Sequence, residues 1–454
     1  MVKRRRVIVT FFGAFLLLSG CRLGQVYERP TDGLPTAYRY SVQESAEVAN
    51  LPWWSLFKDP VLLALLDTAL TNNLDLAVAG TRIRQAEAQL DIVRANLFPR
   101  VNYGLDVGTT LSSVQTTSSV APVVPVSYQV DLWGQFRNLR DASYQDFLAT
   151  EEAYRSITLA LVGGVANAYF LLRDLDNRLL IAEETAATWQ SNLEITKARN
   201  NAGLVSEVIV NQAQIQVEEA KAIIQTFTRL RTQTENGISV LLGRPPMDIP
   251  RGLPLQEQVL PPVLPVGMPS RLLDRRPDIR AVEHQLQAQT YRLGATEALL
   301  YPNITLSANL GASLLNPAVA FADLGAQVLG PIFNSKENKR RVALNRELTE
   351  QLLFTYQNTF VNAMREVEDA LVAVNTYDRE LQSRVAQVEA AKRALDLAWV
   401  RYDNGVSSYL EVLDLQRSSF ATMLRASEVM QLKLSSTVTL YQALGGGWEA
   451  PEAP

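Results

Sequence analysis

Residues 94–108 read RANLFPRVNYGLDVG, and residues 297–311 read EALLYPNITLSANLG. Pro99 matches Pro302 and Gly108 matches Gly311, in both cases 203 positions further along the chain. An offset of 202 joins NNAGLVS at 200–206 to YDNGVSS at 402–408, and the Leu-Gly pair at 242–243 to that at 444–445. A nearly constant offset over these landmarks predicts a tandem duplication of about 200 residues.

The placement of proline predicts long helices in each copy. The chain has 21 prolines, but residues 126–244 and 332–450 contain none, so both stretches can run as helices. From Leu352 to Tyr402, apolar side chains recur every three or four positions, which predicts one helix with a continuous packing stripe. That helix would be about 75 Å long and must project into an aqueous space. The breaks at Ala202-Gly203 and Asn404-Gly405 predict the turns of antiparallel hairpins.

Alternation with a period of two predicts four strands between the helices. The apolar positions are Val101, Tyr103, Leu105 and Val107; Val126, Tyr128, Val130 and Leu132; Ile304, Leu306, Ala308 and Leu310; and, more weakly, those within 323–328. A membrane barrel with a wet interior and a soluble antiparallel sheet both show this alternation. Because membrane barrels start at about eight strands, such a barrel must be shared between chains. The spacing is compatible with a barrel built from either two or three chains.

The N-terminus predicts a lipoprotein signal over residues 1–20. Basic residues 3–6 precede an apolar run from Val7 to Leu18, which is too short to cross a bilayer. The run ends in Leu18-Ser19-Gly20-Cys21, which looks like a bacterial lipobox, and Cys21 is the only cysteine, so it is available for a lipid. The alternative is an ordinary cleaved signal with an incidental cysteine. Arg22 stands where an acidic residue would favour the inner membrane, which predicts an anchor in the outer membrane.

The sequence contains no residue motif that predicts catalysis, a cofactor or a metal site. His284 is the only histidine and is expected to be a solvated surface residue. No glycine-rich phosphate loop, metal-ligand cluster or nucleophile elbow is present in the sequence. Without residues 1–20 the chain has 39 basic and 47 acidic residues, a net charge that argues against nucleic acid as a partner.

Six motifs together resemble the outer-membrane factors of tripartite efflux systems, the TolC/OprM/NodT group. They are the lipobox, WWSLFKDP at 53–60, LDL at 74–76 followed by RIRQA at 82–86, RPDIR at 276–280, YLEVLD at 409–414 and ALGGGW at 443–448. The resemblance covers essentially the whole mature chain. It implies a mainly α-helical fold with a membrane β-barrel portion, in which three protomers build one 12-stranded barrel continuous with a 12-helix periplasmic barrel.

The expected organisation follows the duplication. After the signal come an N-terminal segment (21–60), a first repeat (61–243), a Pro-rich linker (244–269), a second repeat (270–447) and a tail (448–454). Shorter helices are expected within 51–97 and 270–300. The linker either contributes to a belt around the helices or is a plain connection.

Candidate functional residues lie near the predicted hairpin turns. Leu410, Asp414 and Arg417 are spaced i, i+4 and i+7, so they share one helix face. The resemblance implies that they form a periplasmic gate, a leucine ring and an acidic ring supported by arginine, with Tyr402 as a less secure third constriction. The alternative is a solvated ion pair of Asp414 with Arg417. The matching first-copy positions are Val208, Gln212 and Ile215, so any charge-based closure must come from the second hairpin.

The resemblance also implies partners and a function. A periplasmic adaptor, or membrane fusion protein, would dock on the turns at Gly203, Leu204, Val205, Ser206, Gly405, Val406 and Ser407. An inner-membrane transporter of the RND type would supply the energy. The chain is expected to be a homotrimeric, passive, gated exit duct in outer-membrane lipid for drugs, toxic compounds or metal ions. The alternatives are the duct of a type I protein secretion system and a periplasmic coiled-coil lipoprotein scaffold without a pore.

Overall fold

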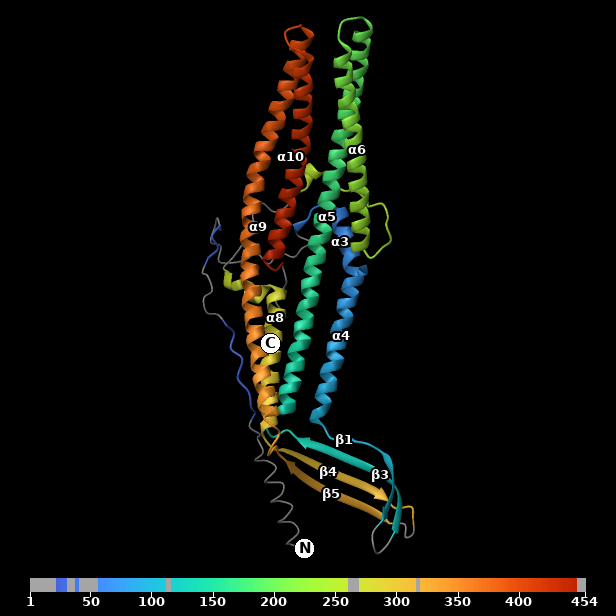
Figure 1. Cartoon of the computed structure of the whole chain (residues 1–454), viewed down its shortest axis with the longest axis vertical. Coiled ribbons are helices and arrows are strands. Elements are labelled where there is room, and N and C mark those ends of the chain that lie inside the picture. The colour runs from blue at the N-terminus through green and yellow to red at the C-terminus, as the bar shows by residue number, and fades with distance from the viewer. Residues whose placement is uncertain are drawn as a thin grey trace. The chain divides into compact units, whose positions relative to one another are not determined.

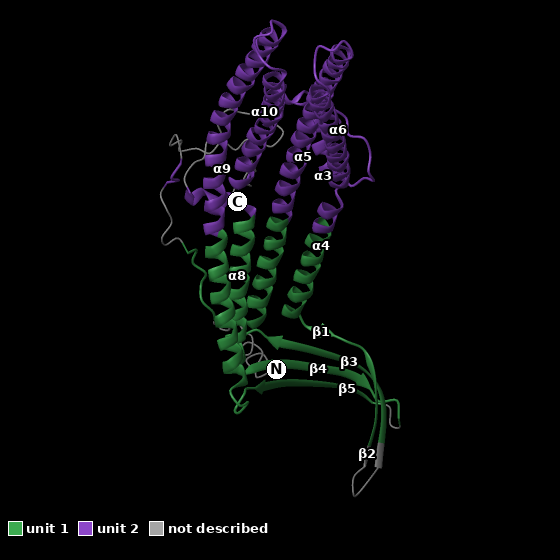
Figure 2. Cartoon of the chain, turned by 45° about the horizontal axis from the view of Figure 1, so that its top comes forward, with its two compact units in different colours: residues 1–32, 80–153, 278–359 green, residues 33–79, 154–277, 360–454 purple. Residues whose placement is uncertain are grey.

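The computed structural model of the chain describes residues 22–30, 37–40, 56–111, 116–259, 269–315 and 319–446 (Figure 1). Cys21, the predicted signal segment 1–20 and the predicted tail 448–454 lie outside these residues. The described chain divides into two units, coloured in Figure 2, and each is described by itself. Unit 1 comprises residues 1–32, 80–153 and 278–359, and unit 2 comprises residues 33–79, 154–277 and 360–454.

Four long helices confirm the prediction from the proline-free stretches. Helices α5 (Gln135–Asn201) and α9 (Glu337–Asp403) each have 67 residues, and α6 (Glu207–Leu241) and α10 (Tyr409–Ala443) each have 35. At 1.5 Å per residue, α5 and α9 are about 100 Å long. Helix α9 therefore contains the whole predicted span from Leu352 to Tyr402. Its packing stripe is not continuous within one chain, however, because Val385 is 49% exposed.

Glycine makes the turn of each hairpin, as the sequence predicts. Gly203 and Gly405 both have φ of +73°, a left-handed conformation that ends a helix without strain in glycine. After each glycine, the next backbone N–H returns to a carbonyl in the last helical turn: Leu204 donates to Arg199, and Val406 donates to Arg401. Figure 1 shows α5 with α6, and α9 with α10, as antiparallel pairs.

Shorter helices occur where they are expected. They are α3 (Pro60–Asn72), α4 (Leu74–Arg94), α7 (Leu272–Arg275) and α8 (Pro277–Glu297), with 3-10 turns at Ala95–Leu97, Leu255–Glu257, Pro269–Arg271 and Ala298–Leu300. Asn73 separates α3 from α4: its side chain accepts the backbone N–H of Leu76 and donates to the carbonyl of Leu241.

The strands form one antiparallel sheet in unit 1. They are β1 (Arg100–Val101), β2 (Gly104–Leu111), β3 (Thr116–Val130), β4 (Asn303–Ala312) and β5 (Ala320–Leu329). Strands β1 and β2 both pair with β3, so together they take the place of the first predicted strand. Strand β4 then pairs with β3 and with β5.

The prediction for the second strand was wrong at both ends. Strand β3 begins at Thr116 instead of Val126, and it ends before Leu132, which lies in a turn closed by the carbonyl of Val130. The first part of β3 contains two prolines, and proline argues against a strand in the sequence because it cannot donate to a strand ladder. Pro125 is tolerated because it lies next to the interruption between β1 and β2, where its carbonyl accepts the N–H of Asn102.

The strand register confirms that the sheet has two chemically different faces. Opposed residues in an antiparallel pair share a face. Tyr128, Leu306 and Ala326 therefore lie together on an apolar face. Gln129, Thr305 and Gln327 lie together on the polar face. In the single chain the apolar face is uncovered, since Leu324 is 84% exposed and Val328 is 64% exposed.

A hydrophobic core in unit 2 joins the two hairpins. Its buried members come from α5 (Trp189, Leu193), α6 (Val217, Ala220), α9 (Ala398) and α10 (Val412, Leu413, Phe420), among others. The rings of Trp189 and Phe420 meet edge to face with centroids 5.4 Å apart. The hairpins are therefore packed against each other and do not diverge as separate rods.

The described part of the predicted linker is firmly attached and is not a plain connection. Asp59, which is fully buried, accepts hydrogen bonds from Leu253 N (2.9 Å), Gln258 Nε2 (2.7 Å) and Tyr169 Oη (2.9 Å). Burial by itself would raise the pKa of the Asp59 carboxyl, but these hydrogen bonds, with those from the start of α3, hold that pKa below its usual value. Arg251 adds ion pairs to Asp176 (3.0 Å) and Glu235 (2.5 Å).

Candidate functional site at the helical hairpin turns

Helix α10 presents two contrasting faces directly after its turn. Tyr409, Val412 and Leu413 are buried in the core of unit 2. Leu410 is 59% exposed, and Asp414 and Arg417 are exposed with it. An exposed leucine, a carboxylate and a guanidinium thus lie along one helix face within two turns.

The two charges on this face have no partner among the residues that the structure describes. Among the described residues, neither Asp414 nor Arg417 has a hydrogen bond or an ion pair. The alternative prediction of an i, i+3 ion pair is therefore wrong for the single chain. Ion pairs of this spacing do form elsewhere, as between Glu218 and Lys221 on α6 (3.0 Å). Both side chains are exposed and are therefore available for pairing with a group outside the described residues.

Tyr402 lies in a different environment, where the two hairpins meet. Its ring is 5.3 Å from the ring of Tyr409 and 6.1 Å from that of Trp399, centroid to centroid. The Arg199 guanidinium, from the end of α5, lies 5.4 Å from the Tyr402 ring centroid and forms an ion pair with Asp403 (3.4 Å). Hydrogen bonding to Tyr402, and then to Asp403, raises the pKa of Arg199.

Neither Arg199 nor Asp403 is among the functional residues predicted from the sequence. Both stand at the edge of the duplicated turn segments, Arg199 just before 200–206 and Asp403 inside 402–408. The signal available in the sequence is a positive charge near the turn of one predicted hairpin and a negative charge near the turn of the other. Only the folded chain shows that the two helix ends are close enough to form an ion pair.

The hairpin turns themselves present apolar side chains to solvent. Leu204 is 74% exposed and Val406 is 68% exposed, while Gly203, Ser206 and Gly405 are also exposed and Val205 and Ser407 are half-buried. In the first hairpin, Val208 and Ile215 are exposed where the second has Leu410 and Arg417. Exposed apolar side chains at both turns form a surface suited to binding another protein.

A metal ion has no candidate site in the part of the chain that the structure describes. No group of three or more His, Cys, Asp or Glu residues there is arranged to hold a metal ion. The expectation of a solvated His284 was wrong, because the residue is half-buried and its Nδ1 lies 2.7 Å from Gln145 Oε1. Packing of α8 against α5, which the local sequence does not reveal, provides that partner.

Known proteins match almost the whole chain. The family described as outer membrane efflux protein matches residues 65–244 and again residues 268–446. The solvent efflux pump outer membrane protein SrpC of Pseudomonas putida is 36% identical, over 97% of this chain and 98% of that protein. The cation efflux system protein CusC of Escherichia coli is 30% identical, over 96% and 98%.

Solved structures of membrane proteins also match almost the whole chain. The open state of the MtrE outer membrane channel of Neisseria gonorrhoeae matches with a TM-score of 0.86 at 29% identity, over 94% of this chain and 98% of that one. A membrane protein from Pseudomonas aeruginosa matches with a TM-score of 0.88 at 31% identity, over 94% and 98%. The chain therefore belongs to the outer membrane efflux protein family, and it is an outer-membrane channel of an efflux pump and not an enzyme.

Proposed function

We propose that three copies of the chain form one outer-membrane duct, in which a 12-stranded barrel continues into a 12-helix periplasmic tunnel. The uncovered apolar face of the sheet supports contact with lipid, and its polar face supports a wet interior. Four strands from each of three chains close a barrel and leave no unpaired edge in the lipid. The equal lengths of α5 and α9, and of α6 and α10, support an origin by tandem duplication, with repeats at 61–243 and 270–447 joined by 244–269.

The mature chain is anchored by lipid on Cys21 after removal of residues 1–20. The lipobox, the absence of any other cysteine and Arg22 at the next position support an anchor in the outer membrane. Two attachments would then hold the protein, the acyl chains and the barrel.

The periplasmic gate consists of Leu410, Asp414 and Arg417, and Tyr402, where the two hairpins meet, forms a third constriction. The lack of an ion-pair partner for Asp414 and Arg417 among the described residues is the observation that supports this proposal. Threefold symmetry brings three Asp414 carboxylates together, and they repel one another unless Arg417 of a neighbouring copy pairs with them. Three Leu410 side chains add an apolar constriction that resists wetting.

Opening depends on partners that prefer the open arrangement. A periplasmic adaptor docks on the turns at 203–206 and 405–407, where Leu204 and Val406 offer apolar contact. An inner-membrane transporter of the RND type supplies the energy. Binding opens the duct only if the adaptor has a higher affinity for the open state than for the closed one.

The transported compounds are small molecules. SrpC is named for solvent efflux and CusC for cation efflux, and both are similar to this chain over nearly its whole length. We favour organic compounds of low polarity, because the solvent efflux protein has the higher identity. Deleting the protein should sensitise the cell to toluene-like solvents and to antibiotics, whereas a duct for protein secretion would leave these tolerances unchanged.

The gate is tested by removing its charges. Asp414→Ala together with Arg417→Ala should raise single-channel conductance in planar bilayers and admit large antibiotics to the periplasm. Glu218→Ala with Lys221→Ala removes an exposed acid–base pair of the same spacing on α6 and should leave the conductance unchanged. If the Asp414/Arg417 variant is trimeric and folded but conducts like the parent, these residues do not form a gate.

A further inference from the structure

Residues 22–30, which we call the N-terminal strap, begin with a closely held arginine in unit 1. Arg22 Nε donates to Asn138 Oδ1 (2.6 Å), and Arg22 Nη2 lies 2.7 Å from Asp141 Oδ2. The guanidinium also lies 5.0 Å from the ring centroid of Tyr291. Three side chains from α5 and α8 thus surround the residue that directly follows Cys21.

The backbone of the strap is held as well. Leu23 N donates to the carbonyl of Trp133 (3.2 Å), and Asn138 Nδ2 donates to the carbonyl of Leu23 (2.8 Å). Asn138 is only 2% exposed, and both ends of its amide bind the strap. A buried amide with its hydrogen-bonding groups directed at one segment shows that the segment is part of the folded unit.

Three glycines from separate parts of the chain allow the strap to approach this closely. A Cβ at Gly294 would lie 2.8 Å from Asn138 Nδ2 and 2.9 Å from Leu23 O, and a Cβ at Gly134 would lie 2.9 Å from Arg22 Cγ. A Cβ at Gly24 would lie 3.0 Å from Gly294 Cα, and Gly24 has φ of +119°. We call Gly24, Gly134, Gly294 and Asn138 the strap seat.

The strap makes a second set of contacts with unit 1 a few residues further along, at Glu283. Arg29 forms a bidentate pair with Glu283, in which Nε and Nη2 are each 2.8 Å from a carboxylate oxygen. Tyr27 Oη donates to the same carboxylate (3.2 Å). If this were the sole fastening, the seven residues 22–28 could span up to about 23 Å, and the chain end would move freely over that range. The seat removes this freedom.

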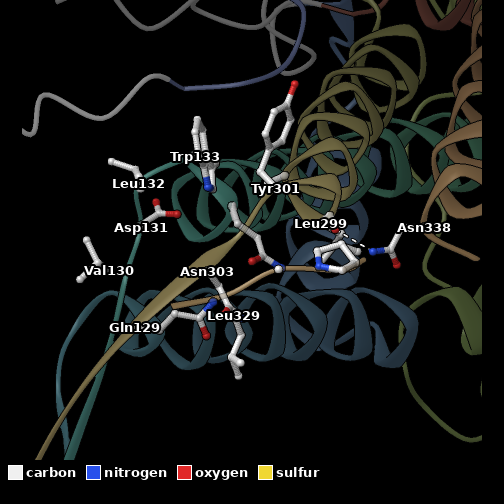
Figure 3. Close-up of a pocket in the computed structure, with 14 residues that line it drawn as sticks. Gln129, Val130, Asp131, Leu132, Trp133, Leu299, Tyr301, Asn303, Leu329 and Asn338 are labelled. Atoms are coloured by element: carbon white, nitrogen blue, oxygen red, sulfur yellow. Dashed lines mark hydrogen bonds between the residues drawn. The ribbon is translucent and has the colours of Figure 1, made fainter. Parts of the chain in front are cut away.

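The seat adjoins an aromatic pair at the end of the sheet. Trp133, whose carbonyl accepts Leu23 N, lies with its ring centroid 4.8 Å from that of Tyr301. The pair stands at a cavity of about 280 Å³ that is also lined by Val130 and Leu329, the last residues of β3 and β5. Figure 3 shows the Trp133 and Tyr301 rings pointing the same way. Tryptophan and tyrosine favour the boundary between lipid and water.

We propose that the strap seat fixes the point at which the lipid anchor leaves the protein, beside the Trp133–Tyr301 pair. Adjacent Cα atoms are about 3.8 Å apart, so a lipid on Cys21 starts next to Arg22 and enters the bilayer at the level where the sheet ends. The anchor is then a short, positioned attachment and not a loose tether. This inference rests on the proposed lipidation of Cys21.

Trypsin tests the seat on the full-length protein. Within residues 22–30 it can cleave only after Arg22, because Arg29 precedes Pro30, and cleavage there separates Cys21 from the rest of the chain. Protein carrying radiolabelled palmitate is treated in detergent, where a bilayer cannot shield the site. The readout is the new N-terminus at Leu23, because cleavage at exposed sites further along, such as Arg39, also separates the label from the rest of the chain. We expect this N-terminus to form slowly in the parent and at least tenfold faster in Gly294→Ala and Asn138→Ala.

Gly237→Ala is the matched control. It is also a glycine-to-alanine change inside a helix, but a Cβ there meets no atom within 4 Å, so it should retain the parental protection. Equal protection of the Arg22–Leu23 bond in the folded, trimeric Gly294→Ala and Asn138→Ala variants, or rapid cleavage of that bond in the parent, would overturn the seat. A parent that takes up no palmitate would instead refute the lipidation on which the inference rests.

Discussion

Asp59 offers the most quantitative test of how the linker is attached. Its Oδ1 accepts Val61 N and Leu62 N, and its Oδ2 accepts Tyr169, Leu253 and Gln258. Asp59→Asn keeps the shape but replaces one acceptor oxygen with an NH₂ group. Whichever way the amide turns, at least two hydrogen bonds to a charged group are lost. At about 1.5–3 kcal/mol each, the smaller loss is roughly 3 kcal/mol.

Hydrogen exchange measures that loss directly. The backbone amides of Leu253 and Gly252 report on it, because the first donates to Asp59 and the second to Tyr169 Oη. About 3 kcal/mol corresponds to roughly 100-fold faster exchange of residues 251–258. Asp67→Asn, an exposed position on the same helix, should exchange like the parent. Unchanged exchange at 251–258 in a folded Asp59→Asn trimer would show that the buried carboxylate does not hold the linker.

The same group predicts a pH dependence with a definite sign. An unfolded aspartate titrates near pH 3.9, and the pKa of folded Asp59 lies below its usual value. The stabilisation is therefore fully present above about pH 4 and is lost as the pH falls through the folded pKa. Protection of residues 251–258 should fall in acid for the parent. It should change less with pH in Asp59→Asn, which has no carboxyl at this position.

Four further predictions test the lipid anchor, the assembly, the apolar face of the sheet and the contact between the hairpins. Cys21→Ser should abolish palmitate labelling while the barrel keeps part of the protein in the membrane, and a parent without label would refute the lipoprotein assignment. The detergent-extracted protein should be a trimer, whereas a stable monomer that needs no detergent would favour a scaffold. Leu324→Arg, on the apolar face, should hinder membrane insertion by about 2–4 kcal/mol, whereas Gln327→Arg, on the polar face, should be tolerated; equal insertion would mean that the face is not in lipid. Asp403→Asn removes the ion pair with Arg199 and should increase nitroxide mobility at the second turn, and unchanged mobility would show that the aromatic contacts suffice.

Periodic features could be predicted from the sequence because each depends on the local backbone. Helix α9 follows from a stripe repeated every three to four residues over 352–402, and the turns at Gly203 and Gly405 follow from the one residue that adopts a positive φ without strain. The two faces of the sheet follow from a period of two. The common face of Leu410, Asp414 and Arg417 needs only the geometry of one helix.

The tertiary structure decided whatever depends on residues far apart in the chain. Arg199 and Asp403 are 204 positions apart, and Arg22 and Asn138 are 116 apart, so no local pattern connects them. Pro125 interrupts the strand pattern in sequence, yet it fits because a break in the facing strand lies beside it. From the sequence, Asp59 is a simple helix cap. In the folded chain its Oδ2 also accepts hydrogen bonds from Tyr169, Leu253 and Gln258. Periodicity determines which surfaces a segment has, but only packing determines which distant groups meet on them.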